Sequence, residues 1–517
     1  MRAVRSCIVL LGVFFSALAL LAPFLTVPAP WGAEVWFFPS VRELGLGLKL
    51  APTLNGMPFT GPGPLAAVLL SLLPFSDLMA LRLLNMLMGC LVCMSVFVFC
   101  SSLWDIKSGV CSALFTMTTW GFAATFGHLG PSALPACLAV ISFLLFAQIY
   151  LMELNSWWYL LAYLLAGGAA LTGGWVPLTF FALSAVFLVL IDMAPAKFAS
   201  IKAFWGIVLV GGAMLAVYGA CRIFEGPALA GSLFSFHQEQ GLLARLWLWV
   251  KFNLPWLLLA APAWLYGEGP NEAGAWRSLL APKTAYASGF AVVLLSGSVQ
   301  EGYALLGIPF GGILTGYWMS RKFLIRERLK GLRTLAFFGT AFLVAGTALI
   351  LIVKSSLTRF SLDLAHGAVI LAFLAVVLLL FLSARRRSAM AIAGLGMAAV
   401  FAMSWHTALV TVPASAEKPA SFARQLREVT PLLVFEDDLV MRGYAAWAGA
   451  KAVVVGRNMV PVGYTAYLAV TTPDLEALLK NLSARMHASV ASSFTTRGTT
   501  ALIRVAPAVP PSRGPGG

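Results

Sequence analysis

The sequence contains few charged residues. Asp, Glu, Lys and Arg make up 11% of its 517 residues, and only 20 are acidic. A soluble domain carries about 25% charged residues. A chain with 60% hydrophobic residues and a mean hydropathy of +0.88 therefore cannot cover its surface with polar groups in water. Lipid is the solvent that fits this composition, which indicates an integral membrane protein.

Cysteine is also scarce, and none of the seven cysteines lies beyond residue 221. This distribution excludes a disulfide framework. Cys90 and Cys93 have C-x-x-C spacing but fall in a predicted membrane helix, so we interpret them as packing residues. The chain lacks a phosphate-binding Gly-rich loop and an H-E-x-x-H motif. His128 and His237 are too isolated to form a metal site.

Apolar segments of near-membrane length follow one another up to residue 406. They predict about thirteen transmembrane helices. The segments lie near residues 7–27, 80–103, 110–126, 133–151, 158–173, 175–192, 204–221, 252–266, 284–298, 304–319, 334–353, 365–383 and 389–406. The first follows Arg2 and Arg5, and we interpret it as an uncleaved signal-anchor helix. The segments beside Gly173-Gly174 are either two spans or one long helix.

Lys and Arg are unevenly divided between alternate loops. Sixteen lie on the side of the N-terminus: Arg2, Arg5, Lys107, Lys197, Lys202, Arg277, Lys283, Arg321, Lys322, Arg326, Arg328, Lys330, Arg333, Arg385, Arg386 and Arg387. Seven lie on the other side: Arg42, Lys49, Arg222, Arg245, Lys251, Lys354 and Arg359. Basic loops face the cytoplasm, so an odd number of spans predicts a periplasmic C-terminal domain. The net charge of +15 then requires no nucleic-acid partner.

Two long loops are predicted on the outside of the membrane. The first, residues 28–75, contains an amphipathic stretch at 41–50 and an apolar stretch at 65–73 that is too short to span, so both are expected to lie in the membrane interface. The second covers 223–252 and ends in a Trp- and Arg-rich pattern that is typical of the interface.

The segment after the last span has the composition of a small soluble domain. Alternating helix and strand patterns predict an α/β domain over residues 407–506. Its strands are expected at 432–435, 452–455, 466–471 and 501–505, and its helices at 421–429, 442–448 and 473–486. The Pro- and Gly-rich tail at 507–517 is expected to be disordered.

The first outside loop carries a family resemblance. Glu34 is followed by Arg42-Glu43-Leu44 and by Ala51-Pro-Thr-Leu-Asn-Gly56, and the next span opens with Arg82-Leu-Leu-Asn85. This order and spacing resemble bacterial GT-C glycosyltransferases that use polyprenyl-phosphate sugars, a group that includes the aminoarabinose transferase of lipid A and the protein mannosyltransferases. The resemblance extends over nearly the whole chain. It implies a GT-C-like membrane domain at 1–406 in the bacterial inner membrane and an outer-face α/β domain.

The chain departs from the family pattern at four positions that are usually charged. The family's Asp-Glu pair is Ala33-Glu34, and a Lys expected to meet lipid phosphate is replaced by Pro62. An acidic residue of the next outside turn is Ser132, and a Lys between the fifth and sixth spans is Gly173. The scaffold therefore resembles the family more closely than the site does.

Sugar transfer from a lipid phosphate needs a base for the acceptor hydroxyl and positive charge for the departing phosphate. The resemblance assigns the catalytic role to Glu34, although a lone acid at a membrane boundary is often simply solvated. Arg42, Arg82 and Arg245 are the lipid-phosphate candidates. Arg42 could instead pair with Glu43, and the other two could be interface anchors. No cofactor is assigned, and a divalent cation remains an alternative source of positive charge.

Three functions fit these observations. The first is a membrane glycosyltransferase that moves a sugar from a polyprenyl-phosphate donor to a lipid A, glycan or protein acceptor on the periplasmic side. The second is a catalytically inactive GT-C relative that binds lipid or a partner protein. The third is a transporter, although its spans would be expected to hold more charged residues.

Overall fold

A computed structural model of the chain describes residues 2–26, 34–45, 53–54, 57–58, 64–72, 77–193, 200–224, 241–320 and 422–507, with short gaps in the last two ranges. The predicted spans at 334–353, 365–383 and 389–406, and the predicted tail beyond residue 507, lie outside them.

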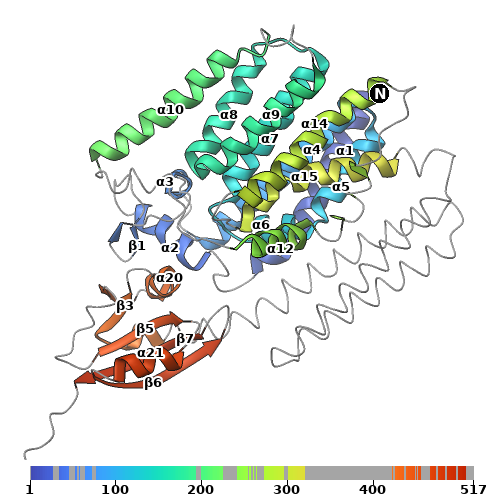
Figure 1. Ribbon diagram of the computed structural model, residues 1–517. Coiled ribbons are helices and arrows are strands. Elements are labelled where there is room, and N and C mark those ends of the chain that lie inside the picture. The colour runs from blue at the N-terminus through green and yellow to red at the C-terminus, as the bar shows by residue number, and fades with distance from the viewer. Residues whose placement is uncertain are drawn as a thin grey trace, which may run out of the picture.

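The membrane part consists of a bundle of helices (Figure 1). Its elements are α1 (Arg2–Leu21), η1 (Ala22–Thr26), α4 (Leu78–Leu103), α5 (Ile106–Met117), α6 (Trp120–Phe126), α7 (Ala133–Met152), α8 (Trp158–Gly173), α9 (Trp175–Asp192), α10 (Ala203–Phe224), α12 (Leu242–Asn253), α14 (Ala273–Leu295), η3 (Glu301–Leu306) and α15 (Ile308–Trp318). Among the described residues, four helices are long and apolar enough to cross a membrane: α4, α7, α9 and the Arg277–Leu295 part of α14. The total of thirteen spans stays a prediction.

Most predicted spans in the described ranges correspond to helices, with informative differences. The predicted span at 110–126 is divided into α5 and α6. At the break, the hydroxyls of Thr118 and Thr119 donate to the carbonyls of Leu114 and Phe115. The alternative left open at Gly173-Gly174 is resolved as two helices, because Gly174 has a φ of 73°, a conformation that favours glycine.

One basic residue lies elsewhere than the sequence predicts. The span predicted at 284–298 begins earlier, because α14 starts at Ala273 and continues through Pro282. Lys283 is therefore a buried residue inside the helix and does not belong to a cytoplasmic loop.

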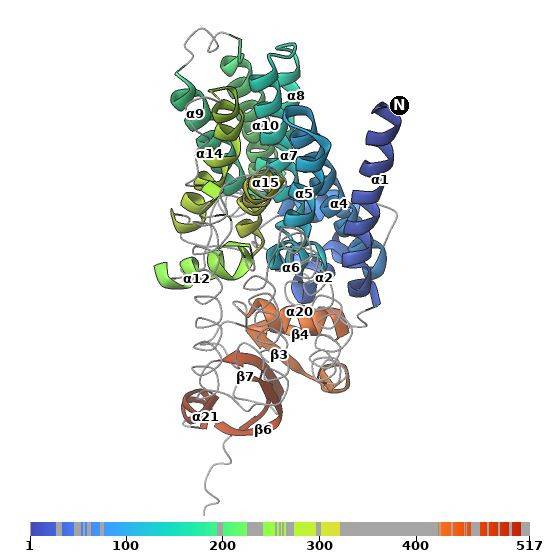
Figure 2. The same cartoon turned by 90° about the vertical axis from the view of Figure 1, so that its right-hand side faces the viewer.

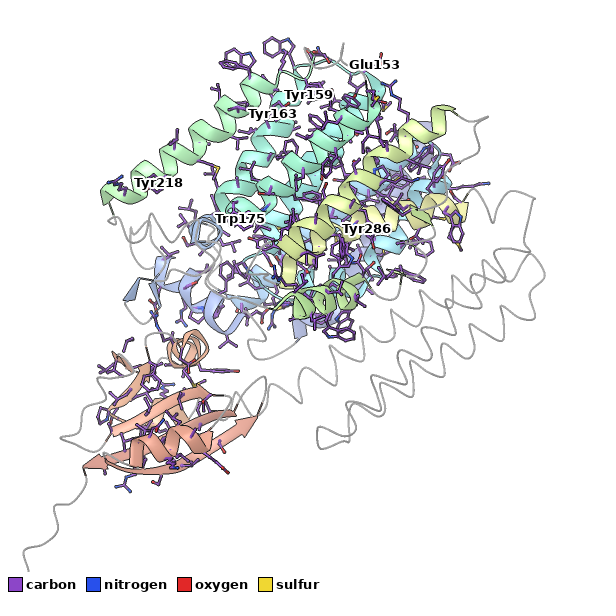
Figure 3. All side chains as sticks on the ribbon, viewed as in Figure 1. Glu153, Tyr159, Tyr163, Trp175, Tyr218 and Tyr286 are labelled. Carbon is purple, nitrogen blue, oxygen red and sulfur yellow. The ribbon has the colours of Figure 1, made fainter. Side chains whose placement is uncertain are left out.

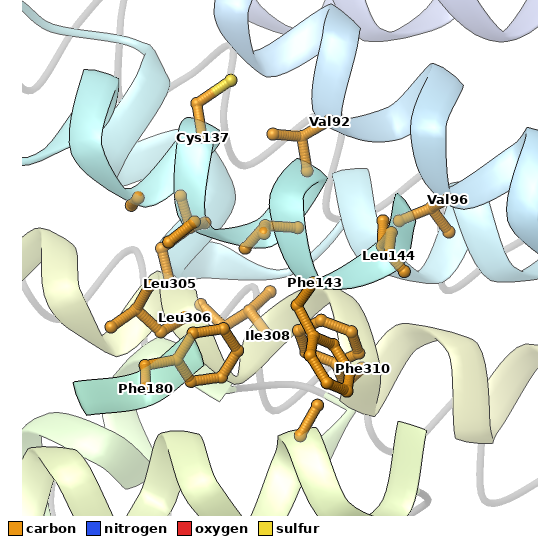
Figure 4. Close-up of a cluster of buried hydrophobic side chains, with 14 of the residues drawn as sticks. Val92, Val96, Cys137, Phe143, Leu144, Phe180, Leu305, Leu306, Ile308 and Phe310 are labelled. Atoms are coloured by element: carbon orange, nitrogen blue, oxygen red, sulfur yellow. The ribbon is translucent and has the colours of Figure 1, made fainter. Parts of the chain in front are cut away.

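An aromatic cluster joins three helices of the bundle (Figure 4). The rings of Phe143 on α7, Phe180 on α9 and Phe310 on α15 have centroid separations of 5.5 to 6.2 Å. Nearby, the Tyr303 hydroxyl donates to the Gly173 carbonyl at 2.7 Å and fastens η3 to the end of α8. Because lipid is as apolar as these side chains, close packing rather than escape from water holds such helices together.

Small residues allow α15 to lie directly on α5. A Cβ on Gly312 would lie 2.3 Å from the Thr116 hydroxyl oxygen, and one on Gly316 would lie 2.4 Å from the backbone nitrogen of Ser112. At the end of this seam, the hydroxyls of Ser108 and Ser320 are 2.7 Å apart. This is the close backbone approach that small-x-x-x-small patterns permit in membranes.

The first outside loop folds into short elements at one end of the bundle. They are α2 (Glu34–Gly45), strands β1 (Thr53–Leu54) and β2 (Met57–Pro58), and α3 (Pro64–Ser71). The two strands are antiparallel around Asn55-Gly56, a dipeptide that favours tight hairpins. One face of α2 packs with α3, Leu81 and Leu129 in a buried apolar cluster.

The C-terminal part contains a five-stranded sheet of order β4-β3-β5-β7-β6. Its strands are β3 (Leu432–Phe435), β4 (Ala452–Val455), β5 (Ala466–Thr472), β6 (Met486–Thr495) and β7 (Thr499–Pro507), and its helices are α20 (Leu439–Ala448) and α21 (Leu475–Ser483). Strands β4, β3 and β5 are parallel, whereas β7 is antiparallel to β5 and to β6. The four other strands lie where the sequence predicted them, whereas β6 was not predicted and its first residue was expected to end a helix.

The N-terminus and the sheet lie at opposite ends of the molecule (Figures 1 and 2). Helices α2, α6 and α12 are at the same end as the sheet. This arrangement agrees with the predicted division of the loops between two sides. Which end faces the cytoplasm stays a prediction from the Lys and Arg distribution.

Candidate functional site

Glu34 and Arg82, two of the predicted site residues, form an ion pair. The Arg82 Nε donates to Glu34 Oε1 at 2.8 Å, and its Nη2 donates to Oε2 at 2.6 Å. The backbone N–H of Leu129 donates to Oε1 at 2.6 Å. Three N–H groups thus converge on one carboxylate. Fork-shaped pairs of this kind are the strongest hydrogen-bonded pairs between charged side chains.

Three separate elements supply these groups. Glu34 is the first residue of α2, where the helix dipole favours a negative charge. Arg82 lies near the start of α4, and Leu129 lies in the turn between α6 and α7. One turn after Arg82, the Asn85 Nδ2 donates to the carbonyls of Thr125 and His128 at 3.0 and 2.6 Å. Asn85 therefore fixes the turn that presents the Leu129 amide.

The ion pair is enclosed. Glu34 is 0% exposed and Arg82 is 2% exposed. The family assignment gave Glu34 a catalytic role and Arg82 a role in binding phosphate. In this conformation each group is occupied by the other, so either role requires the pair to separate.

The contribution of the turn around His128 was not predicted from the sequence. Asn85 and Leu129 had no chemical signal of their own, because the bonds that matter run to backbone carbonyls and from a backbone amide. The quoted Arg82-Leu-Leu-Asn85 motif does include Asn85. Its spacing puts both side chains on one face of α4, a signal that could have linked them.

The other two predicted phosphate ligands lie apart from this pair. Arg42 is exposed on α2, two turns after Glu34. Arg245 is half-buried on α12, and its Nη1 donates to the carbonyl of Leu294 near the end of α14. The structure therefore brings together Glu34 and Arg82 alone among the four residues, and the roles of Arg42 and Arg245 stay predictions.

The C-terminal domain contacts Val35, the residue next to Glu34. The side chain of Val35 is buried in the hydrophobic cluster of that domain, together with Leu426, Met441 and Tyr444. Helix α20 packs on α2, and the two lie side by side in both views (Figures 1 and 2). Burial raises the pKa of the Tyr444 hydroxyl to about 12.

Helix α20 is covered on every side. Five consecutive residues of α20, from Met441 to Ala445, are buried, and five residues pass around the whole circumference of an α-helix. Helix α20 is therefore enclosed between the sheet and α2. Helix α2 in turn connects the C-terminal domain to the Glu34–Arg82 pair.

A second charged cluster lies at the opposite end of the bundle. Arg277 on α14 donates from Nε and Nη2 to Asp192 at the end of α9, both at 2.8 Å. The Tyr150 hydroxyl donates to the same carboxylate at 2.8 Å. Figure 3 shows the neighbouring Glu153 and Tyr159 at the end farthest from the C-terminal sheet. Because this cluster lies at the other end of the bundle from the Glu34–Arg82 pair, we interpret it as a structural contact that holds the ends of α7, α9 and α14 together.

No metal-binding group emerges from the described part of the chain. There, no cluster of three or more His, Cys, Asp or Glu side chains could hold a metal ion. Among the contacts described above, Arg82 is the charged group closest to the carboxylate of Glu34, the predicted catalytic residue.

Comparisons with known proteins identify the fold class. No protein-family model matches the sequence, and no curated protein sequence matches it. Solved structures do match, and they confirm the GT-C fold that the resemblance in the sequence implies.

Two of the matching structures are of ArnT from Cupriavidus metallidurans. The form bound to undecaprenyl phosphate is 15% identical, with a TM-score of 0.69 over 97% of this chain and 98% of that chain. The apo form is 16% identical, with a TM-score of 0.70 over the same shares. The Archaeoglobus fulgidus oligosaccharyltransferase is more distant, with 13% identity, a TM-score of 0.44, and coverage of 88% of this chain and 65% of that chain.

Proposed function

We propose that this chain is a membrane glycosyltransferase that moves a sugar from a polyprenyl-phosphate donor to a lipid A, glycan or protein acceptor on the periplasmic side. One observation carries the proposal: its fold matches, over 97% of the chain, that of ArnT solved with undecaprenyl phosphate. A likeness that covers both chains almost end to end supports a common architecture for the membrane part and for the domain that follows it.

The Glu34–Arg82 pair is the proposed centre of the site. It lies where the first outside loop, the start of α4 and the α6–α7 turn meet. Glu34 would accept the proton of the acceptor hydroxyl, and Arg82 would stabilise the charge that develops on the departing phosphate. Arg42 and Arg245 are proposed as further lipid-phosphate contacts. A divalent cation is an alternative source of positive charge.

The proposed organisation follows from this function. Residues 1–406 would form the membrane domain in the bacterial inner membrane, and residues 407–506 would form the periplasmic domain above it. The docking of α20 on α2 supports a C-terminal domain on the same side as the site.

A catalytically silent relative is the second candidate, and the geometry of Glu34 favours it. Both carboxylate oxygens already accept hydrogen bonds, and the side chain is 0% exposed. The neighbouring position, an acid in the family pattern, is Ala33. A protein with this site could bind lipid or a partner without transferring a sugar.

A complementation experiment in the native host tests the proposal. The gene is deleted and replaced by the wild type, by Glu34→Gln or by Glu428→Gln, a control at an exposed acid of the C-terminal domain. Mass spectrometry of lipid A and other envelope glycans is the readout. We expect the deletion and Glu34→Gln to lose one sugar that the wild type and the control retain.

Other outcomes separate the alternatives. Loss of a sugar in the deletion but not in Glu34→Gln would keep the function and reject Glu34 as its base. A deletion that changes no glycan would contradict the transferase and support the silent relative.

A further inference from the structure

The donors around Glu34 have the geometry of an anion site. The Nε and Nη2 of Arg82 point to different carboxylate oxygens at 2.8 and 2.6 Å, and the Leu129 N–H adds a third donor at 2.6 Å. A guanidinium fork with a backbone amide can hold a carboxylate or a phosphate equally well, because both present oxygens at matching spacing.

The donors and the carboxylate belong to different parts of the fold. Arg82 lies on α4, which is long enough to span the membrane, and Leu129 lies in a turn fixed by Asn85. Glu34 instead arrives on α2, a short helix of the loop between two spans. The hydrogen-bond donors are therefore part of the bundle, whereas the Glu34 carboxylate that they bind comes from a helix of the loop.

The position of Arg82 also indicates that it requires an anion. It lies on α4, a helix that is long enough to span the membrane. It is also 2% exposed. A buried cation in this place needs a negative partner at all times, because an uncompensated buried charge is strongly unfavourable. Replacement of the Glu34 carboxylate by another anion avoids this cost.

We propose that Glu34 occupies, in the free protein, the anion site that the phosphate of a polyprenyl phosphate takes on binding. This inference rests on the proposed function for the identity of the ligand. The incoming phosphate receives the hydrogen bonds of Arg82 and Leu129, and the Glu34 carboxylate turns away. Arg82 keeps a negative partner throughout. The Glu34 carboxylate is therefore released from Arg82 only when the lipid phosphate is bound.

A titration of the purified full-length protein in lipid nanodiscs tests this exchange. The probes are undecaprenyl phosphate, undecaprenol without the phosphate, and inorganic phosphate. The proteins are the wild type, Glu34→Gln, Arg82→Gln and the control Glu428→Gln. The three ligands separate recognition of a lipid-linked phosphate from recognition of the tail alone or of free phosphate.

The exchange predicts that Glu34→Gln binds undecaprenyl phosphate at least tenfold more tightly than the wild type, because a neutral amide competes less for Arg82. Arg82→Gln should lose most of the affinity, and Glu428→Gln should match the wild type. Affinity in Glu34→Gln that is unchanged or weaker would overturn the exchange. So would a wild type that binds undecaprenol as tightly as the phosphate.

A measurement on the unaltered protein covers the case in which the variants do not fold. A water-soluble carbodiimide modifies accessible carboxylates, and mass spectrometry can follow its attachment to Glu34. We expect undecaprenyl phosphate to increase the modification of Glu34 and to leave that of Glu428 unchanged. Unchanged or reduced modification of Glu34 would overturn the proposal.

The two proposals fail in different ways. Tighter binding by Glu34→Gln together with unaltered glycans in the deletion strain would keep the exchange and reject the transferase. A missing sugar in the deletion strain together with unchanged affinity in Glu34→Gln would keep the transferase and reject the exchange.

Discussion

Arg82 donates hydrogen bonds to both carboxylate oxygens of Glu34, and neither residue is more than 2% exposed. Another forked pair, Arg277 with Asp192, has the same donor atoms, but the Arg277 side chain is 38% exposed. The two pairs differ mainly in their access to solvent. They therefore provide an internal comparison between a buried and a partly hydrated ion pair.

Replacement of Arg82 by leucine should destabilise the protein far more than the same replacement of Arg277. Arg82→Leu removes the positive charge that lies against the buried Glu34 carboxylate, a loss of about 3–5 kcal/mol. Arg277→Leu removes a partly hydrated pair and should cost about 1 kcal/mol or less. Thermal unfolding in one detergent measures both. The double variant Glu34→Met with Arg82→Leu should recover much of the loss, and equal effects of the two single variants would contradict this account.

The seam between α5 and α15 should not accept even one methyl group at Gly316. A Cβ there would lie 2.4 and 2.5 Å from the backbone N and Cα of Ser112, so the helices would have to separate. We expect Gly316→Ala to lower the thermal stability, with overpacking costs of about 1–3 kcal/mol. Gly212→Ala on α10 is the control, because no described atom lies within 4 Å of its Cβ position. It should be neutral or slightly stabilising, and a similar loss in both variants would contradict the packing argument.

A charge at Val35 should release the C-terminal domain from α2. Val35 is 4% exposed within the cluster of that domain, so Val35→Asp would bury a carboxylate without a partner. Limited proteolysis of the purified protein should then separate the domain from the bundle sooner than in the wild type. Val453→Asp, at a position that is 53% exposed on β4, is the matched control and should behave like the wild type. Equal protection in both variants would show that Val35 does not hold the domain.

The C-terminal domain is predicted to lie in the periplasm. Sixteen Lys and Arg residues assigned to one side and seven to the other set this orientation. The burial of Lys283 inside α14 removes one charge from the majority side without changing the sign. An alkaline phosphatase fused after Gly517 should be active, and a green fluorescent protein at the same place should be dark. A bright fluorescent fusion would reverse the topology.

Sequence patterns identified most elements because each has its own periodicity. Strands β3 and β4 lie where their Val- and Leu-rich runs predicted them, and the helix break at Gly174 follows from two adjacent glycines. Strand β6 was missed because its Ala- and Ser-rich sequence has no strong apolar alternation. It is held by pairing with β7, which no local pattern encodes.

The sequence singled out Glu34 and Arg82 separately but not the contact between them, and their roles stay predictions. A motif selected Glu34 and a second motif selected Arg82, yet nothing in either indicated that the two would pair. Pairing depends on how α2 packs against α3 and the turn at Leu129, and this packing is a tertiary property. The Leu129 amide could not be predicted at all, because every residue other than proline carries the same N–H group.

The central claim is that the protein consumes a sugar carried on a polyprenyl phosphate. The most direct measurement is lipid mass spectrometry of the native host, comparing the deletion strain with strains that carry the wild type or Arg82→Gln. The account predicts that one undecaprenyl-phosphate sugar accumulates in the deletion strain and in Arg82→Gln, and returns to its normal level with the wild type. Unchanged levels of every undecaprenyl-phosphate sugar after deletion would contradict it.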